Sequence, residues 1–310
     1  MTGPLVALTG ATGFIGRHLL RELPKRGYRV RVLLRRPAEL PPEASGAVVG
    51  DIARPQNMGA ALSGVDAVIH SAGIAHAMSG TPEDDYRVLN TEATIGLARA
   101  AEKARAKRFV FLSSIRAQAG PTAGGVVTEA DEAAPTDAYG RSKLAAEEGL
   151  AALGIDWVAL RPVLVYGPGV KGNMAALVRL ARSPYPLPLG GLTAKRSLLA
   201  LDNLAAAIDT ALAAPGPLRR PLIVADPEPL TVPAMIAALR EGLGRGPGVF
   251  PVPQWLMEAA FRALGRGEAF ERLAGSLVAS PAALQGLGWA PPVQTRAALA
   301  ALARNPASGA

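Results

Sequence analysis

Cysteine is absent from this 310-residue chain, and histidine occurs only three times. The lack of cysteine excludes disulfides, thiolate metal ligands and a cysteine nucleophile. His18 and His76 have no partner at metal-ligand spacing, so we assign them no catalytic role and predict no metal site. We interpret His70 as a structural residue at the end of a strand rather than as a base.

Long hydrophobic runs are also missing, although apolar residues make up 49% of the chain. No uninterrupted apolar stretch reaches the roughly 20 residues of a membrane-spanning helix, so we expect no integral membrane segment. The first apolar run, Leu5–Leu8, passes directly into a glycine-rich turn and lacks the basic segment and longer apolar region of a signal peptide. We therefore expect a cytoplasmic protein.

Aromatic residues are scarce, at 5%, while the formal net charge is +8. Such a charge fits either a polyanion-binding surface or solvated helix faces beside a site for phosphorylated small molecules. The scarcity of aromatic residues and the absence of a recognition module argue against a nucleic-acid partner. We expect a polyanionic small substrate instead.

Three glycines mark the most informative segment, Thr9–Gly16, which follows an apolar run and opens a helical pattern. This strand–turn–helix context is typical of a loop that binds the phosphates of a dinucleotide. Gly10 permits the tight turn, Gly13 lets the backbone approach a pyrophosphate, and Gly16 lets the helix pack closely on the sheet. An ordinary turn is the alternative. The residues that we expect to contact a cofactor here are Gly10, Thr12, Gly13, Phe14, Ile15 and Gly16.

Short apolar runs alternate with helical patterns through the first half of the chain. The candidate strands are Leu5–Leu8, Arg29–Leu34, Ala47–Val49, Ala67–His70, Arg108–Leu112 and Trp157–Leu160. The candidate helices are Phe14–Arg26, Asn57–Leu62, Pro82–Ala106 and Tyr139–Leu153. Nearly apolar strands separated by helices imply a parallel sheet covered on both faces. The fold class is therefore α/β, with a Rossmann-type doubly wound parallel sheet.

After Pro168 the proline and glycine content rises, which predicts a smaller and looser C-terminal lobe. Helical patterns there lie near Asp202–Ala213, Val232–Leu243, Gln254–Leu264 and Thr295–Ala303. We predict a dinucleotide-binding domain over 1–168 and a mainly substrate-binding lobe over 169–310, with some segments returning to the sheet. The amphipathic pattern at 254–264 favours a core or dimer-interface helix over a membrane-surface helix.

The end of the second strand predicts the type of dinucleotide. A site for NAD places a carboxylate there, whereas this chain has Arg35 and Arg36, with no acid before Glu39. Arginine can pair with the 2′-phosphate of NADP, so NADP is favoured over NAD. The alternative is that both arginines only solvate a loop and that NAD is bound.

Two further strand ends carry candidate cofactor contacts. Asp51, next to Ile52, can reach an adenine amino group, although a turn-forming aspartate is nearly as plausible. The small residues Ser71, Ala72 and Gly73 would let a cofactor lie across the backbone at the end of the fourth strand.

A serine, a tyrosine and a lysine form the strongest catalytic pattern. Tyr139 and Lys143 are four residues apart and share one face of a helix. The ammonium would favour the phenolate and lower the pKa of the tyrosine. A hydroxyl from Ser114, or from Ser113 as the fallback, could bind the same substrate oxygen. The alternative is an ordinary Tyr and Lys on a helix surface.

These motifs resemble the extended short-chain dehydrogenase/reductase family, and more narrowly its NAD(P)-dependent nucleotide-sugar epimerases, dehydratases and 4-keto reductases. The matching segments are Thr9–Gly16, Gly50-Asp51, Ser113-Ser114, Tyr139–Lys143 and Leu160–Gly169. The resemblance implies that Tyr139 is the catalytic acid/base, that Lys143 lowers its pKa and holds the nicotinamide ribose, and that Ser114 binds the reacting oxygen. It also implies that Asn90 supports the active-site helix, and it places Asn90 and Pro162 beside the cofactor.

The same resemblance points to three substrate contacts in the second lobe. It implies that Asn173 and Arg196 contact the diphosphate of a nucleotide sugar, with Arg272 as a weaker candidate for the same task. The alternatives are a loop asparagine without a ligand and a salt-bridged arginine on a helix surface. A homodimer formed through the helices near Pro82–Ala106 and Tyr139–Leu153 is a further implication.

The chain departs from the dehydratases of this family, which place a pair of carboxylates directly after the catalytic serine or threonine. Here Ile115 and Arg116 follow Ser114, so dehydration is disfavoured. Our first hypothesis is an NADPH-dependent reductase of the C4 keto group of a nucleotide-linked sugar, of the UDP-4-keto-6-deoxy-N-acetylhexosamine type. The second is a UDP-hexose 4-epimerase with tightly bound NAD, and the third is a non-catalytic dinucleotide-binding sensing or assembly protein.

Overall fold

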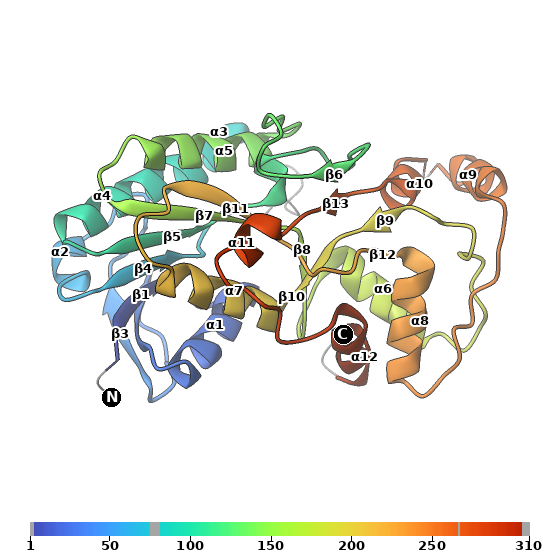
Figure 1. Cartoon of the computed structure of the whole chain (residues 1–310), viewed down its shortest axis with the longest axis horizontal. Coiled ribbons are helices and arrows are strands. Elements are labelled where there is room, and N and C mark those ends of the chain that lie inside the picture. The colour runs from blue at the N-terminus through green and yellow to red at the C-terminus, as the bar shows by residue number, and fades with distance from the viewer. Residues whose placement is uncertain (1–2, 75–80, 266, 306–310) are drawn as a thin grey trace.

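A seven-stranded parallel sheet forms the larger lobe of the computed structural model, which describes residues 3–74, 81–265 and 267–305 (Figure 1). Its strands are β1 (Leu5–Thr9), β2 (Arg29–Leu34), β3 (Ala44–Val48), β4 (Ala67–His70), β5 (Arg108–Leu112), β7 (Asp156–Pro162) and β11 (Arg220–Val224). They lie in the order β11-β7-β5-β4-β1-β2-β3. The order reverses between β1 and β4, and ligands of such sheets bind at the carboxyl ends of the strands beside this point. The predicted Rossmann-type α/β fold is confirmed.

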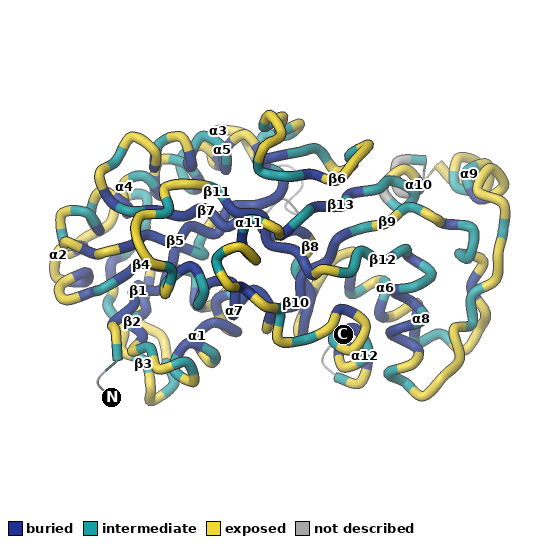
Figure 2. Tube along the Cα trace, in the orientation of Figure 1, coloured by how far each residue is buried: buried dark blue, intermediate teal, exposed yellow. Residues whose placement is uncertain are grey.

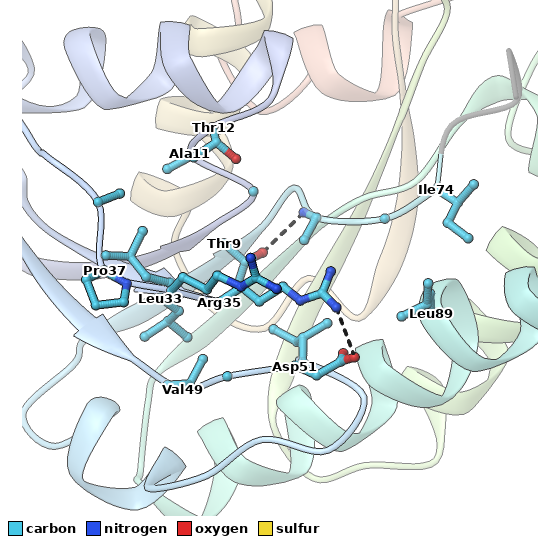
Figure 3. A pocket seen from close by; sticks show the side chains of 18 residues that line it. Thr9, Ala11, Thr12, Leu33, Arg35, Pro37, Val49, Asp51, Ile74 and Leu89 are labelled. Atoms are coloured by element: carbon cyan, nitrogen blue, oxygen red, sulfur yellow. Dashed lines mark hydrogen bonds and ion pairs between the residues drawn. The ribbon is translucent and has the colours of Figure 1, made fainter.

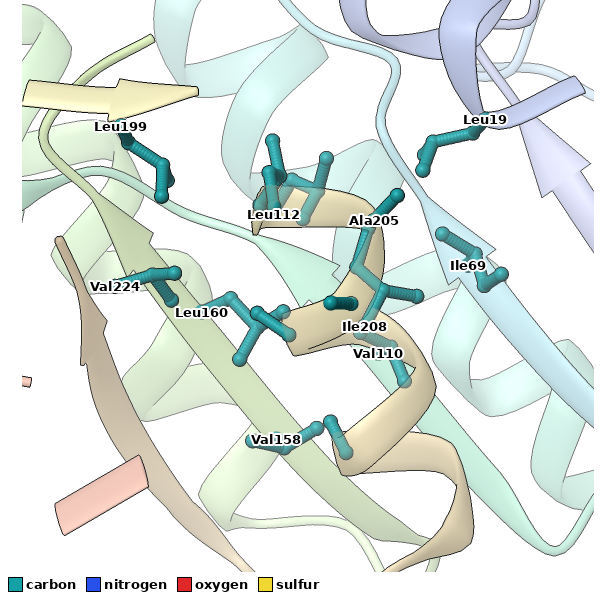
Figure 4. Packing of buried hydrophobic residues seen from close by; sticks show 14 of the residues in the cluster. Leu19, Ile69, Val110, Leu112, Val158, Leu160, Leu199, Ala205, Ile208 and Val224 are labelled. Carbon is teal, nitrogen blue, oxygen red and sulfur yellow. The ribbon is translucent and has the colours of Figure 1, made fainter. Parts of the chain in front are cut away.

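Alternate residues of each central strand pack against helices on opposite faces of the sheet, which explains why the strands read as nearly continuous apolar runs. On one face, Val110 and Leu112 join the core formed with α1 (Phe14–Lys25) and α7 (Leu201–Ala213) (Figure 4). Their neighbour Phe111 joins the core of the other face. The helices of that face are α2 (Met58–Ala61), α4 (Ala93–Lys103) and α5 (Ala138–Ala151).

The second lobe has its own buried core, built from helices and short strands (Figures 1 and 2). Its helices are α6 (Gly172–Arg182), α8 (Val232–Gly242), α9 (Gln254–Ala263), α10 (Gly267–Ala274) and α12 (Thr295–Arg304). The short ladders pair β8 (Leu164–Tyr166) with β10 (Leu198–Ala200), β9 (Lys195–Arg196) with β12 (Leu230–Thr231), and β6 (Val126–Val127) with β13 (Val278–Ala279). Several elements after Pro168 nevertheless belong to the sheet core, namely β11, α7 and α11 (Ala282–Gln285). The boundary at residue 168 stays a prediction.

Helix α9 lies at the surface of the second lobe, contrary to the interpretation of segment 254–264 as a core helix. It buries Met257, while Trp255 is 69% exposed and Leu264, just beyond its end, is 74% exposed. The interface and membrane-surface interpretations of this helix stay predictions. Across the described ranges, no helix has the length and apolar character needed to span a bilayer.

The predicted helix 82–106 is interrupted in the structure. It consists of α3 (Glu83–Tyr86), a π-helical turn η1 (Arg87–Glu92) and α4. The wider turn places Asn90 in a fully buried position. Single π turns inside helices often occur at functional sites, and a 3.6-residue pattern cannot reveal them.

Two strand predictions also differ from the structure. The third strand is β3, at 44–48 rather than 47–49, because this edge strand carries small and exposed residues and has little apolar signal. Strand β11 was not predicted, since the short run Leu222–Ala225 lies within a segment rich in proline and glycine.

Replacing Ile208 by alanine should lower the free energy of unfolding by about 3 kcal/mol, because it removes a fully buried side chain between α7 and the sheet. Urea unfolding followed by circular dichroism measures the loss. Leu256→Ala on α9 is the matched control, since this side chain is 47% exposed, and its effect should stay within about 0.5 kcal/mol. Equal losses for both variants would contradict the placement of α7 in the sheet core.

Candidate active site

The turn between β1 and α1 brings backbone into contact at two glycines. Gly10 has φ +71°, and a Cβ atom added there would lie 2.7 Å from the amide nitrogen of Ala72. A Cβ on Gly16 would lie 2.0 Å from the carbonyl oxygen of Gly10, which also accepts the N–H of Gly13 at 2.9 Å. Only glycine fits at positions 10 and 16, so the turn has the close helix–strand approach expected of a dinucleotide loop.

A pocket of about 620 Å³ opens at the carboxyl ends of β1, β2 and β4, next to this turn (Figure 3). Eight of the expected cofactor contacts line it: Gly10, Thr12, Arg35, Arg36, Asp51, Ile52, Ala72 and Gly73. Apolar side chains that the sequence did not single out complete the wall: Leu33, Leu34, Val49, Ile74 and Leu89. Leu33 and Leu34 are the last two residues of β2, Val49 and Ile74 follow strands, and Leu89 lies in η1. A position at the end of a strand is the signal that could have found most of them.

Other expected cofactor contacts lie outside this lining: Gly13, Phe14, Ile15, Gly16, Ser71, Asn90, Pro162, Tyr139 and Lys143. Phe14 packs against the core of the second lobe and Ile15 against the core shared by α1 and α7. Pro162 ends β7, paired with Val224 of β11.

Arg35 extends across the pocket toward Asp51, as Figure 3 shows. The two side chains are 74% and 49% exposed, and Arg35 Nη2 lies 3.9 Å from Asp51 Oδ2. An ion pair this long and this exposed contributes little free energy. Arg35 can therefore turn to another anion at small cost.

A chain of hydrogen bonds connects the pocket floor to Asn90 through His70. The hydroxyl of Thr94 donates to the carbonyl of Asn90 at 2.6 Å, so it must accept from His70 Nε2 at 3.0 Å. His70 Nδ1 is then an acceptor, and Thr9 Oγ1 donates to it at 2.7 Å while accepting the Ala72 N–H at 3.2 Å. Burial lowers the pKa of His70 to about 3, which keeps the ring neutral. This geometry agrees with a structural role for His70.

Asn90 links helix α5 to the segment after β4. Its Oδ1 accepts the N–H of Ile74 at 2.8 Å, and its Nδ2 donates to the Ile74 carbonyl at 3.2 Å and to Ser142 Oγ at 3.1 Å. Ser142 in turn donates to the carbonyl of Tyr139 at 2.8 Å. A Cβ on Gly73 would lie 2.7 Å from Asn90 Oδ1, so a larger residue would push this link away.

The structure brings Ser114, Tyr139 and Lys143 together beside the pocket wall. The hydroxyls of Ser114 and Tyr139 are hydrogen-bonded, while Ser114 Oγ also accepts the N–H of Arg116 at 3.2 Å. Lys143 Nζ donates to the carbonyl of Leu112 at 2.9 Å and lies 3.5 Å from the position of a Cβ on Gly73. Ser113, the fallback, instead turns its hydroxyl to Glu147 at 2.5 Å, leaving Ser114 as the partner of Tyr139.

The electrostatics of Tyr139 differ from the sequence expectation. Burial raises the pKa of Tyr139, and the hydrogen bond with Ser114 only partly opposes this. Lys143 Nζ lies 5.9 Å from the centroid of the tyrosine ring, and its hydrogen bond runs to a backbone carbonyl. The loss of hydration is therefore the largest influence on the Tyr139 hydroxyl, and the expected lowering of the tyrosine pKa is wrong.

The expected substrate contacts lie on the second lobe and not in the pocket lining. Asn173 is exposed in the first turn of α6. Arg196 is half-buried on β9, where burial lowers its pKa, and its Nη2 lies 3.4 Å from the position of a Cβ on Gly275. The side chain of Arg272, and the whole of His76, lie outside the described residues. Within the described part of the chain, no group of three or more acidic or histidine side chains could hold a metal ion.

Sequence reasoning missed a buried ion pair under this site, between Glu147 of α5 and Arg161 of β7. The signal was present, because Glu147 follows Lys143 by one helical turn and Arg161 interrupts an apolar strand.

Known proteins with a similar sequence and fold indicate the family of this chain. The family model of the NAD dependent epimerase/dehydratase family matches residues 6–224. A UDP-glucose 4-epimerase of Vibrio cholerae is 35% identical over 93% of this chain and 90% of its own length. The structure of MoeE5 in complex with UDP-glucose and NAD is 27% identical, with a TM-score of 0.71 over 95% of this chain and 96% of that one.

The fold is also that of the UDP-glucuronic acid 4-epimerase from Bacillus cereus in complex with NAD, with a TM-score of 0.74, 20% identity and coverage of 96% of this chain and 94% of that one. The glycine turn, the pocket beside it and the serine, tyrosine and lysine at its wall thus agree with a family match over most of the chain. The chain belongs to the NAD-dependent epimerase/dehydratase family, and with it to the extended short-chain dehydrogenases/reductases.

Proposed function

We propose that this protein catalyses NAD(P)-dependent hydride transfer at C4 of a nucleotide-linked sugar. The observation that carries the proposal is the hydrogen-bonded pair of Ser114 and Tyr139 above the buried Lys143, at the wall of the pocket. The relative from Vibrio cholerae and MoeE5, both named for or bound to UDP-sugars, support the substrate class.

The pocket fits a dinucleotide. The crowded backbone at Gly10 and Gly16 leaves the pocket side of the turn open for phosphates, and the cavity of about 620 Å³ has room for the adenosine half. Thr12 would lie by the phosphates and Asp51 by the adenine, with Arg35 and Arg36 available to a 2′-phosphate. When bound, the nicotinamide group supplies or accepts the hydride.

The residues of the chain would handle the proton and the developing charge. In reduction, Tyr139 gives its proton to the C4 oxygen and Ser114 donates a hydrogen bond to the same atom. Lys143 supplies a positive charge below the tyrosine and a donor for the ribose. Because burial raises the pKa of Tyr139, its phenol stays protonated at neutral pH, which suits proton donation to an alkoxide.

We favour NADPH-dependent reduction of a 4-keto sugar, of the UDP-4-keto-6-deoxy-N-acetylhexosamine type, over 4-epimerisation. Arg35 and Arg36 line the pocket where an NAD site has a carboxylate, and Arg35 is held only by a weak ion pair. UDP-hexose 4-epimerisation with bound NAD is the second candidate, supported by 35% identity to the relative named for it.

The second lobe would supply the contacts to the nucleotide diphosphate. Arg196 offers a half-buried guanidinium and Asn173 an exposed amide on that lobe. Roles for these residues and for Arg272, a homodimer and a cytoplasmic location stay predictions.

Tyr139→Phe should lower kcat for 4-keto reduction by about 10²- to 10⁴-fold, because it removes the general acid and keeps the ring. The Kd for NADPH should change little. Consumption of the keto sugar is measured by chromatography, and NADPH binding by calorimetry. Full turnover by this variant would contradict the assignment of Tyr139 as the general acid.

Arg35→Ala should weaken NADPH binding by about 10-fold or more and leave NADH binding nearly unchanged, since only NADPH carries the 2′-phosphate. Arg99→Ala, an exposed arginine on α4, is the matched control for the loss of one positive charge. Equal losses for both cofactors in Arg35→Ala would refute the 2′-phosphate contact.

Denaturing the purified protein should release little dinucleotide if it is a reductase, because a reductase exchanges its cofactor in every turnover. Mass spectrometry of the supernatant identifies what is released. Stoichiometric NAD would instead favour the epimerase. A protein that arrives empty and binds neither NADPH nor NADH would overturn both and favour a sensing or assembly protein.

A further inference from the structure

A cluster of charged and polar side chains is buried directly beneath the candidate catalytic residues. Glu147 and Arg161 are each 4% exposed. Arg161 Nη2 lies 2.5 Å from Glu147 Oε2, and Arg161 Nε lies 3.1 Å from both carboxylate oxygens. The carboxylate of α5 is therefore clamped to strand β7 by a forked ion pair.

Two further groups fix this pair. Ser113 Oγ donates to Glu147 Oε1 at 2.5 Å, so the residue next to Ser114 is tied to the same carboxylate. The remaining arm of Arg161 donates to Gln118 Oε1, and Gln118 Nε2 donates to the carbonyl of Asp131 at 2.6 Å. The orientation of Glu147 is thus determined from several sides.

Lys143 lies one helical turn before Glu147 on the same face of α5, in a setting with little hydration. Its Nζ is 4.6 Å from the centroid of the Phe111 ring and donates to a strand carbonyl. Burial lowers the pKa of Lys143 to about 8, and the negative charge of Glu147 opposes this.

The other titratable groups around Lys143 do not supply a negative charge. Tyr139 on α5 is a protonated phenol at neutral pH, and His70 on β4 is a neutral ring. Arg161 on β7 is positive and is bound to Glu147. Among the residues that the structure describes, Glu147 is the charged group that opposes the lowering of the Lys143 pKa by burial.

We propose that Glu147 is a positioning residue, the buried counter-charge that keeps Lys143 protonated beside Tyr139, and that Arg161 and Ser113 hold its carboxylate in place. The effect of Glu147 on turnover rests on the proposed function. The effect of Glu147 on the charge of Lys143 is independent of that function, because it can be measured without substrate.

The test follows the titration of the lysine side chains by NMR after labelling at the ε-carbon. The chain has six lysines, which makes the signals separable: Lys25, Lys103, Lys107, Lys143, Lys171 and Lys195. Lys143→Met identifies the signal of interest. In Glu147→Gln this signal should titrate about 1 pH unit lower than in the unmodified chain. The alkaline limb of kcat/KM for keto reduction should move in the same direction.

Matched variants separate charge from folding. Glu147→Asp keeps the charge, so Lys143 should titrate at nearly the same pH as in the unmodified chain. Ser113→Ala removes a hydrogen bond without removing charge and should shift the titration midpoint of Lys143 far less than Glu147→Gln does. Because Glu147→Gln leaves Arg161 without its partner and can unfold the chain, Glu147→Gln/Arg161→Gln is the second test. This double variant should recover the unfolding midpoint, but Lys143 should still titrate at a lower pH than in the unmodified chain.

An unchanged titration of Lys143 in a folded variant that lacks the Glu147 charge would overturn the inference. A shifted titration with an unshifted rate profile would overturn the positioning role of Glu147. A shifted titration in a chain that neither reduces a keto sugar nor epimerises a UDP-hexose would support the counter-charge and refute the proposed function instead.

Discussion

The contact between the turn that follows β1 and the first turn of α1 is the constraint on which the rest of the site depends. At Gly16 the helix approaches the carbonyl of Gly10 so closely that no side-chain carbon fits between them. This approach directs the helix N-terminus to the carboxyl edge of the sheet, beside the point between β1 and β4 where the strand order reverses. The pocket, the small residues after β4 and the side chain of Lys143 all lie at that edge.

Beneath the pocket the titratable groups of the site are buried, and this burial has the largest influence on their charge. His70 is neutral because it is fully buried, and Tyr139 keeps its proton for the same reason. Lys143 lies one helical turn from Glu147 on α5, and the negative charge of that carboxylate opposes the lowering of the lysine pKa by burial. The protein therefore combines a retained phenol proton on Tyr139 with a buried lysine side chain whose Nζ lies 5.9 Å from the centroid of the tyrosine ring.

Much of the fold could be predicted because it depends on large apolar side chains in regular patterns. Strands such as β5 are buried on both faces, so their sequence is strongly apolar and their limits are clear. Strand β3 has little buried surface, and its limits were shifted for that reason. The grouping of Ser114, Tyr139 and Lys143 was also predictable, because strand ends and one helix face must meet at the same edge of a parallel sheet.

What could not be predicted depends on three-dimensional packing. The sequence does not reveal whether Phe14 faces a ligand or a core, and here it packs into the core of the second lobe. The sign of the Tyr139 pKa shift depends on burial, which no spacing rule gives. The π-helical turn at Asn90 and the pairing of Glu147 with Arg161 likewise arise from contacts between distant segments.

The hydrogen-bond chain through His70 has a mechanical consequence. Each hydroxyl in it, from Thr9 to Thr94, has a single allowed direction, so the donors all point the same way along the chain. Sliding β4 relative to the turn that carries Asn90 would reverse or break one of these directions and leave a buried polar atom unpaired. The pocket floor and the helical turn that carries Asn90 are therefore held in a fixed relation to each other by this chain.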